Sequence, residues 1–267
     1  MTNVSAEAAG TIVLGDITVN RLGLGTNRIT NVPQARALLK QAVALGVNFI
    51  DTAYRYGSGE SEKTIGETLV PYEGVVIATK GGWEETTPDE LPGQLDESLR
   101  RLRTDHVDLY QLHRVNPNVP IEETVAMLKR LQEEGKVRHI GLSEITVEQL
   151  EKARAVAPIV SVQNQYNVMV RQHEDLVNYC TQNGIVFIPW FPLGGLAGDA
   201  EKVNAMLADV AAKYDASPQQ IALAWLLKRS PVILPIPGTL SVEHLEENLA
   251  AASIELEDAD YRKLTEL

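Results

Sequence analysis

The stretch VVIATKGGWEETTPDELPGQLDESLRRLRTDHVDLYQLH, residues 75–113, contains a strand, a helix and a second strand in succession. Residues 75–80 are almost continuously apolar, as is usual for a strand that is buried on both faces. Residues 91–102 then have leucines at helical spacing, and residues 107–113 form a second apolar run. Strands joined through a helix pair in parallel, so this stretch predicts an α/β fold.

The same unit recurs along the chain. Apolar runs that each precede a predicted helix also occur at residues 21–26, 47–52, 138–143, 160–166, 184–190 and 231–238, which gives eight strands. Division of 267 residues by eight gives roughly 33 residues per unit. This fits a (β/α)8 barrel, and no linker or change of composition divides the chain. We therefore expect one (β/α)8 TIM barrel domain over residues 1–267, with an N-terminal β-hairpin at residues 11–20.

An open, doubly wound sheet is the competing architecture. It would require the pattern Gly-x-Gly-x-x-Gly after the first strand, where a dinucleotide binds. The first strand is followed by GLGTNR, residues 23–28, in which Arg28 stands in the place of the third glycine. The sequence therefore lacks this dinucleotide-binding pattern.

Composition and charge exclude several classes of protein. The chain is 44% hydrophobic and 22% charged, and no apolar run reaches the roughly 18 residues that a membrane span needs. Its start, MTNVSAEAAG, has no basic cluster or apolar core of a signal peptide, and the single Cys180 cannot form an internal disulfide. We expect a cytoplasmic protein with no membrane contact and a buried, inert thiol. The net charge of −12 argues against a nucleic-acid partner.

Polar or aromatic residues end six of the predicted strands. Each has an ordinary structural explanation, such as a helix cap, a surface lysine or a core histidine. In a barrel, however, the carboxyl ends of the strands meet at one rim and carry the catalytic groups. Six such residues in register therefore predict an active site: Asp51, Lys80, His113, Ser143, Gln163 and Trp190.

An aspartate, a tyrosine, a lysine and a histidine together suit proton transfer to a carbonyl oxygen. A lysine ammonium stabilises a nearby phenolate, a carboxylate keeps the lysine charged, and a histidine hydrogen-bonds the substrate oxygen. Asp51 is followed by two candidate tyrosines, Tyr54 and Tyr56. None of these groups is a strong nucleophile, so the attacking group must come from outside. A hydride carrier fits this requirement.

From end to end the chain resembles the aldo-keto reductase family. The stretches that carry the resemblance are NFIDTAYRYG (48–57), VVIATKGG (75–82), DLYQLHRVNP (108–117), HIGLSEIT (139–146), VQNQYNV (162–168) and PIPGTLSVEHLEENLAA (235–251). The resemblance implies that Asp51, Tyr56, Lys80 and His113 are catalytic, with Tyr56 as the general acid. Tyr54 is then expected to line the pocket or pack beside it.

The resemblance also implies a nicotinamide cofactor that lies across the barrel mouth. Ser143 and Gln163 would then bind the nicotinamide carboxamide, and Trp190 would stack on the ring. The expected cofactor residues are completed by Phe191, Leu193, Gly238, Thr239, His244 and Asn248. Relatives often have asparagine where this chain has Glu144. Relatives also often place a cation near the cofactor's 2′-phosphate, but residues 237–248 contain no Lys or Arg. We expect NADPH, with NADH left open.

The expected substrate is a small carbonyl compound, held by loop residues Arg28, Tyr54, Trp83 and Arg114. Similarity to bacterial reductases that convert pyridoxal to pyridoxine makes pyridoxal the suggested substrate. A Schiff-base aldolase that uses Lys80 is one alternative, and a non-catalytic barrel that senses nucleotides or binds a partner is another. The five histidines show no spacing of metal ligands, so no metal is expected.

Overall fold

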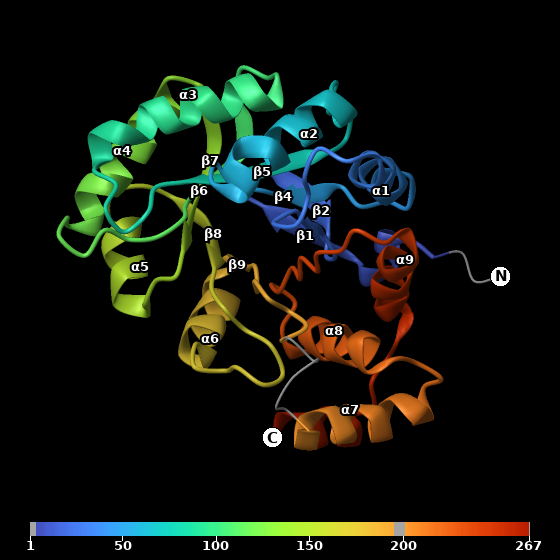
Figure 1. Ribbon diagram of the computed structural model, residues 1–267. Helices are drawn as coiled ribbons and strands as arrows, with labels where there is room; N and C mark the ends of the chain where they lie inside the picture. Colours follow the sequence, from blue (N-terminus) through green and yellow to red (C-terminus); the bar gives the residue numbers. More distant parts are fainter. Residues whose placement is uncertain (1–3, 195–200, 267) are drawn as a thin grey trace.

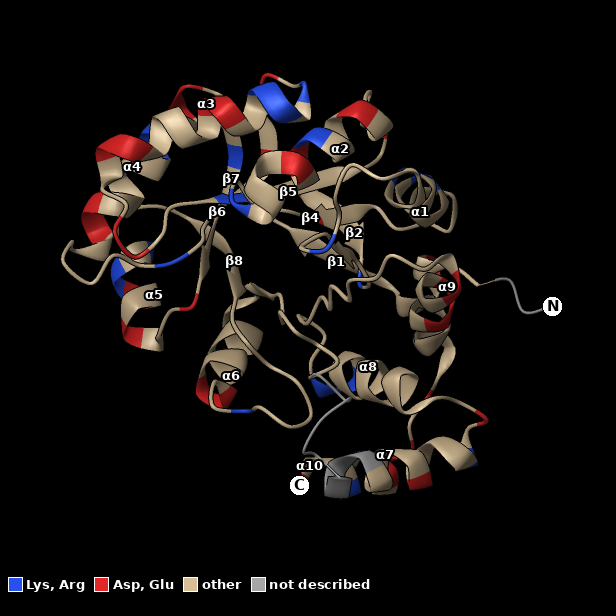
Figure 2. Cartoon of the chain, in the orientation of Figure 1, with Lys and Arg blue, Asp and Glu red and all other residues tan. Residues whose placement is uncertain are grey.

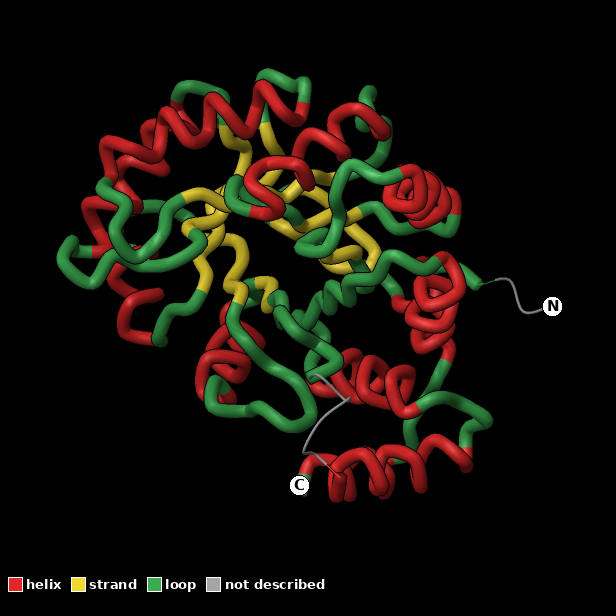
Figure 3. The backbone as a smooth tube through the Cα atoms, viewed as in Figure 1, coloured by secondary structure: helices red, strands yellow, loops and turns green. Residues whose placement is uncertain are grey.

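The computed structural model describes residues 4–194 and 201–266, and in these a ring of strands is enclosed by helices (Figure 1). Seven parallel strands follow one another around the ring in chain order. They are β3 (Leu24–Gly25), β4 (Phe49–Asp51), β5 (Val76–Gly81), β6 (Val107–Leu112), β7 (Val137–Ser143), β8 (Ile159–Gln163) and β9 (Val186–Phe187). Figure 3 shows the same arrangement, with the strands in yellow inside the red helices.

The segment 231–238, which was predicted as the eighth strand, closes the ring. On one side the Leu234 N–H donates to the carbonyl of Phe187, at 2.9 Å. On the other side the Gly23 N–H donates to the carbonyl of Pro235, also at 2.9 Å. The predicted (β/α)8 barrel is therefore confirmed.

The same segment is not a regular strand, and here the prediction was wrong. Pro231, Pro235 and Pro237 have no N–H group, so they cannot donate to a strand ladder. The closure is also tight, because a Cβ on Gly25 would lie 2.7 Å from the carbonyl oxygen of Ile236. Glycine at this position lets the first strand approach the last segment.

The helices pack their apolar faces on the outside of the ring. In α3 (Leu91–Leu102), for example, the leucines at 91, 95, 99 and 102 are all buried. The other helices are α1 (Pro33–Ala44), α2 (Glu60–Leu69), α4 (Ile121–Glu133), α5 (Val147–Arg154), α6 (Glu174–Asn183), α7 (Glu201–Lys213), α8 (Pro218–Arg229), α9 (Val242–Ala250) and α10 (Asp258–Thr265). The sequence analysis did not predict α10. Short 3₁₀ helices are η1 (Ala6–Ala9), η2 (Tyr56–Gly59), η3 (Pro88–Glu90) and η4 (Ala251–Ser253).

Acidic side chains lie on these outer helices, with red segments on α3, α4, α6 and α9 in Figure 2. The charge of −12 is thus carried largely outside the ring. Among the described helices, none combines the length and the apolar character that crossing a membrane requires.

The predicted hairpin closes the amino end of the barrel. It consists of β1 (Thr11–Leu14) and β2 (Ile17–Asn20), paired antiparallel. Its residues Ile12, Leu14 and Val19 belong to the apolar cluster inside the ring. The strands contribute Phe49, Val76, Ala78, Leu109 and Val186 to that cluster. Ile188, Leu234 and Ile236 join it from segments outside the assigned strands.

The interior changes from apolar to polar along each strand. Because side chains alternate between the faces of a strand, Lys80 shares the inner face of β5 with Val76 and Ala78. Gln111 similarly follows Leu109 on β6. The carboxyl ends of the strands therefore point polar groups into the space above an apolar layer.

Candidate active site

Asp51, Lys80 and Tyr56 meet at the carboxyl end of the barrel. The Lys80 ammonium donates to Asp51 Oδ2 at 2.6 Å, to the carbonyl of Thr52 at 2.8 Å and to Tyr56 Oη at 3.2 Å. Lys80 and Asp51 are almost completely buried. Three of the predicted residues, from three separate segments, are thus in direct contact.

Two amides hold the other oxygen of the Asp51 carboxylate. Its Oδ1 accepts from Gln111 Nε2 at 3.1 Å and from Gln163 Nε2 at 2.9 Å. A buried carboxylate needs such donors in addition to its cationic partner. The sequence analysis missed Gln111, although a glutamine within an apolar strand, two residues before His113, was a usable signal.

Lys80 keeps its charge in spite of burial. Burial alone lowers the pKa of a lysine, but the negative charge of Asp51, together with Tyr56, outweighs this and raises the pKa of Lys80. All three N–H groups of the ammonium are used in hydrogen bonds. A Schiff-base nucleophile needs a neutral amine, so this geometry argues against the aldolase alternative.

The turn after β4 selects between the two tyrosines. Tyr56 begins η2, in which Gly57 has a φ of 57°, a left-handed conformation that glycine adopts without strain. This turn brings Tyr56 into the cavity at the barrel mouth. The Tyr54 ring instead lies 4.7 Å from the Arg101 guanidinium and is not among the residues that line the cavity. Arg55, which the sequence analysis did not select, lines the cavity in its place.

His113 stands beside Tyr56 as a neutral imidazole. The two ring centroids are 5.8 Å apart, and Trp83 packs its ring edge-on against His113 at 4.8 Å. Burial, followed by the positive charges of Lys80 and Arg114, lowers the pKa of His113 to about 2. The buried Nδ1 has no partner among the described residues. His113 can therefore hydrogen-bond a ligand but cannot act as a cationic acid near neutral pH.

The cavity at the mouth has a volume of about 750 Å³. Of the predicted residues, the cavity lining includes Arg28, Asp51, Tyr56, Trp83, His113, Arg114, Gln163, Trp190, Phe191, Leu193, Gly238 and His244. Ser143, Thr239 and Asn248 are buried and do not line it. Ser143 Oγ accepts from Arg114 at 3.3 Å, and Thr239 Oγ1 accepts from the N–H of Ser241 at 3.0 Å.

Glu144 supports Trp190. Its Oε1 accepts from the indole Nε1 at 2.5 Å and from the backbone N–H of Gln165 at 2.8 Å. Glu144 itself has a φ of 55°, in the left-handed region.

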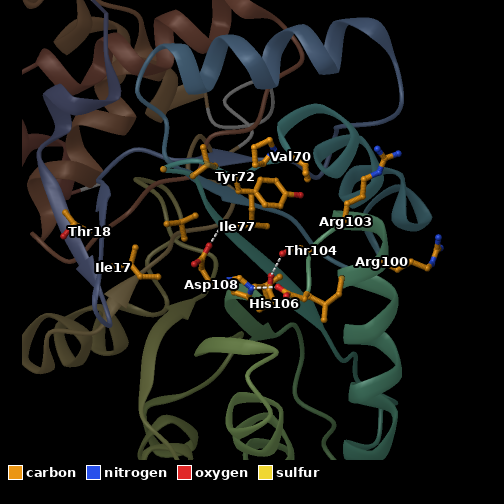
Figure 4. Close-up of a pocket in the computed structure, with 17 residues that line it drawn as sticks. Ile17, Thr18, Val70, Tyr72, Ile77, Arg100, Arg103, Thr104, His106 and Asp108 are labelled. Carbon is orange, nitrogen blue, oxygen red and sulfur yellow. Dashed lines mark hydrogen bonds and ion pairs between the residues drawn. The ribbon is translucent and has the colours of Figure 1, made fainter.

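A second cavity, of about 870 Å³, lies at the opposite end of the barrel (Figure 4). It is lined by the start of β5, the hairpin and the segment after α3. Its polar groups bind one another: Asp108 accepts from the N–H of Ile77 at 3.1 Å, and Tyr72 Oη donates to the carbonyl of Leu102 at 2.6 Å. No group of three His, Cys, Asp or Glu residues that could hold a metal occurs among the described residues.

Comparison with known proteins gives a consistent family. The family model described as "Aldo/keto reductase family" matches residues 21–267. The chain is 39% identical to pyridoxine 4-dehydrogenase of Escherichia coli, over 94% of this chain and 96% of that protein.

Solved structures of the same kind superpose closely. A thermostable aldo-keto reductase in complex with the inhibitor epalrestat has a TM-score of 0.90 and 34% identity, over 96% of this chain and 98% of that one. An aldo-keto reductase of Klebsiella pneumoniae in complex with NADPH has a TM-score of 0.81 and 28% identity, over 96% of this chain and 94% of that one.

Proposed function

Because the chain belongs to the aldo/keto reductase family, we propose that it reduces an aldehyde or ketone to an alcohol, with NADPH as the reductant. One contact carries the proposal: the ammonium of Lys80 lies 3.2 Å from the hydroxyl of Tyr56. The charge of this lysine is maintained by Asp51 at 2.6 Å. A phenol next to a permanent cation can give up its proton, because the cation stabilises the phenolate that remains.

The side chains take separate roles in the proposed reaction. The carbonyl oxygen of the substrate lies between Tyr56 and His113, and neutral His113 orients it with an N–H donor. When bound, the nicotinamide ring supplies the hydride that adds to the carbonyl carbon. Tyr56 donates its proton to the oxygen as the C=O double bond opens, and Lys80 stabilises the resulting phenolate. Solvent then returns a proton to Tyr56.

The residues around the cavity suit a nicotinamide. The Trp190 indole offers a flat face to an aromatic ring, and Phe191 is 45% exposed at the same mouth. Gln163 uses its amide nitrogen on Asp51, while its amide oxygen makes no hydrogen bond to the described residues. That oxygen can accept from the N–H of a carboxamide.

We assign Arg28, which lines the cavity, to the 2′-phosphate of the cofactor rather than to the substrate. Its neighbour Asn27 lies against Gly238, with Oδ1 3.3 Å from the position that a Cβ on Gly238 would take. Residues 237–248 themselves contain no Lys or Arg. An arginine that reaches this side of the cavity would supply the charge that NADPH requires and NADH does not.

Replacement of Tyr56 by phenylalanine tests the proposal. We expect Tyr56→Phe to lower kcat by about 10²- to 10⁴-fold, the usual contribution of general acid catalysis. NADPH binding, measured by quenching of tryptophan fluorescence, should change little, because the hydroxyl does not contact the expected cofactor residues.

Tyr54→Phe is the matched control. It removes a hydroxyl two residues away and keeps the ring that packs under Arg101. The control should retain wild-type turnover. Turnover of Tyr56→Phe within about twofold of the wild type would contradict the assignment of the acid.

Pyridoxal is the substrate that we propose to assay first. The support is the 39% identity to an Escherichia coli protein named pyridoxine 4-dehydrogenase, which covers 94% of this chain. Oxidation of NADPH in the presence of pyridoxal, followed at the nicotinamide absorbance band, is the measurement.

A further inference from the structure

Two arginines lie over one tryptophan at the edge of the catalytic cavity. The guanidinium carbon of Arg55 is 4.7 Å from the centre of the Trp83 ring, and that of Arg114 is 5.1 Å from it. Trp83 in turn packs edge-on against His113 at 4.8 Å. All four residues line the cavity. The two cations are thus fixed one aromatic ring away from the proposed position of the reacting carbonyl.

Neither arginine has an acidic partner. Among the side chains of residues 4–194 and 205–266, no carboxylate lies within 4.0 Å of Arg55 or Arg114 in an ion pair. Within the part of the chain whose side chains are described, Arg114 donates only to neutral oxygens, the carbonyl of His113 at 2.8 Å and Ser143 Oγ at 3.3 Å. By contrast, Arg101 and Arg229 are paired with glutamates.

The carboxylate inside the cavity cannot serve these arginines. Asp51 is already bound by Lys80, Gln111 and Gln163. The positive charge is also unusual for this molecule, whose net charge is −12. Two like charges held near one ring favour an anion between or beside them, and the guanidinium fork matches the oxygens of carboxylate and phosphate.

We infer that Arg55 and Arg114 bind an anionic group of the substrate, so that the enzyme prefers carbonyl compounds that carry a carboxylate or a phosphate. The inference rests on the proposed reductase function and defines its substrate class. Trp83 holds the two guanidinium groups and spaces them from His113.

The test uses pairs of aldehydes that share the same aldehyde-bearing ring and differ in charge. One pair is 4-carboxybenzaldehyde and 4-nitrobenzaldehyde, and the other is pyridoxal 5′-phosphate and pyridoxal. For Arg55→Met and Arg114→Met, kcat/KM should fall about 10- to 100-fold with the anionic member, as expected for one lost hydrogen bond to a charged group. With the neutral member of each pair it should change less than about threefold. Comparison of each variant with the wild type cancels the different intrinsic reactivities of the aldehydes.

Arg130→Met is the control variant, because it removes the same charge from an exposed position on α4. Arg130→Met should leave kcat/KM unchanged for all four aldehydes. In a separate measurement on the wild type, salt added from about 0.05 to about 0.5 M should raise KM only for the anionic aldehydes. KM for NADPH should stay constant in Arg55→Met, whereas Arg114 also contacts the expected cofactor residues Ser143 and Trp190, so its variant does not serve this readout.

Three outcomes separate the possibilities. Equal losses for both members of a pair, or a raised KM for NADPH in Arg55→Met, overturn the inference and leave the reductase function intact. A preference for only one of 4-carboxybenzaldehyde and pyridoxal 5′-phosphate supports the inference and identifies the anion as carboxylate or phosphate. A wild-type enzyme that oxidises NADPH with none of the four aldehydes contradicts the proposed function itself.

Discussion

His113 differs from the usual histidine because it is held neutral. The pKa of a free histidine is near 6.5, whereas burial and the adjacent positive charges lower that of His113 to about 2. Its imidazole therefore stays unprotonated as the pH falls through the range in which an ordinary histidine gains its charge.

This predicts the pH profile of the enzyme. With the neutral substrate 4-nitrobenzaldehyde, kcat/KM should not fall with an apparent pKa near 6.5 when the pH is lowered from about 8 to about 5. The measurement is a steady-state profile of the wild type and of His113→Gln. An acidic limb near pH 6.5 that disappears in His113→Gln would show that the imidazole titrates in this range.

Glu144 gives a second prediction at the scale of a residue. Its carboxylate fixes the indole of Trp190 through a hydrogen bond of 2.5 Å. Glu144→Ala should weaken NADPH binding about tenfold, as expected for one lost hydrogen bond to a charged group. Glu144→Gln keeps an acceptor oxygen and should rescue most of the affinity. Fluorescence titration with NADPH checks both variants, and equal affinity of Glu144→Ala and wild type would rule out the supporting role.

At the scale of elements, closure of the ring depends on a glycine. A Cβ on Gly25 would lie 2.7 Å from the carbonyl oxygen of Ile236, a backbone atom that cannot rotate away. Gly25→Ala should therefore lower the free energy of unfolding by about 1–3 kcal/mol, the usual cost of overpacking. Urea denaturation is the measurement.

Gly93→Ala is the matched change on α3. A Cβ at position 93 would meet nothing within 4 Å, and alanine favours a helix over glycine by roughly 0.5–1 kcal/mol. Gly93→Ala should raise the stability while Gly25→Ala lowers it. If the two variants were equally stable, the contact with Ile236 would carry no strain.

The sequence predicted the order of the elements better than the regularity of each strand. Apolar runs followed by amphipathic helices indicated the order around the ring, because each run needs a helix to cover it. The run at 231–238 looked like the others, yet three prolines leave it without the donors of a regular strand. Hydrophobic pattern reports burial, and backbone donors decide whether the buried segment becomes a strand.

At the scale of the whole molecule, the candidate site residues were predictable from the sequence where they lie at the carboxyl ends of strands. Asp51 is the last residue of β4, Lys80 is the residue before the end of β5, and His113 directly follows β6, so the barrel itself brings them together. Contacts made by loops were less accessible from sequence. The turn at Gly57 decides that Tyr56 and not Tyr54 enters the cavity, and Glu144 meets Trp190 across 46 positions of sequence. The assignment of the whole chain to one domain stays a prediction.

The hairpin at the amino end has a consequence for turnover. Ile12, Leu14 and Val19 pack into the inside of the ring there, so the hairpin covers that end of the barrel. The substrate and the product must use the same entrance, so the product must leave before the next substrate molecule enters. A spent cofactor or a bulky inhibitor bound at that entrance would stop turnover without contacting Tyr56.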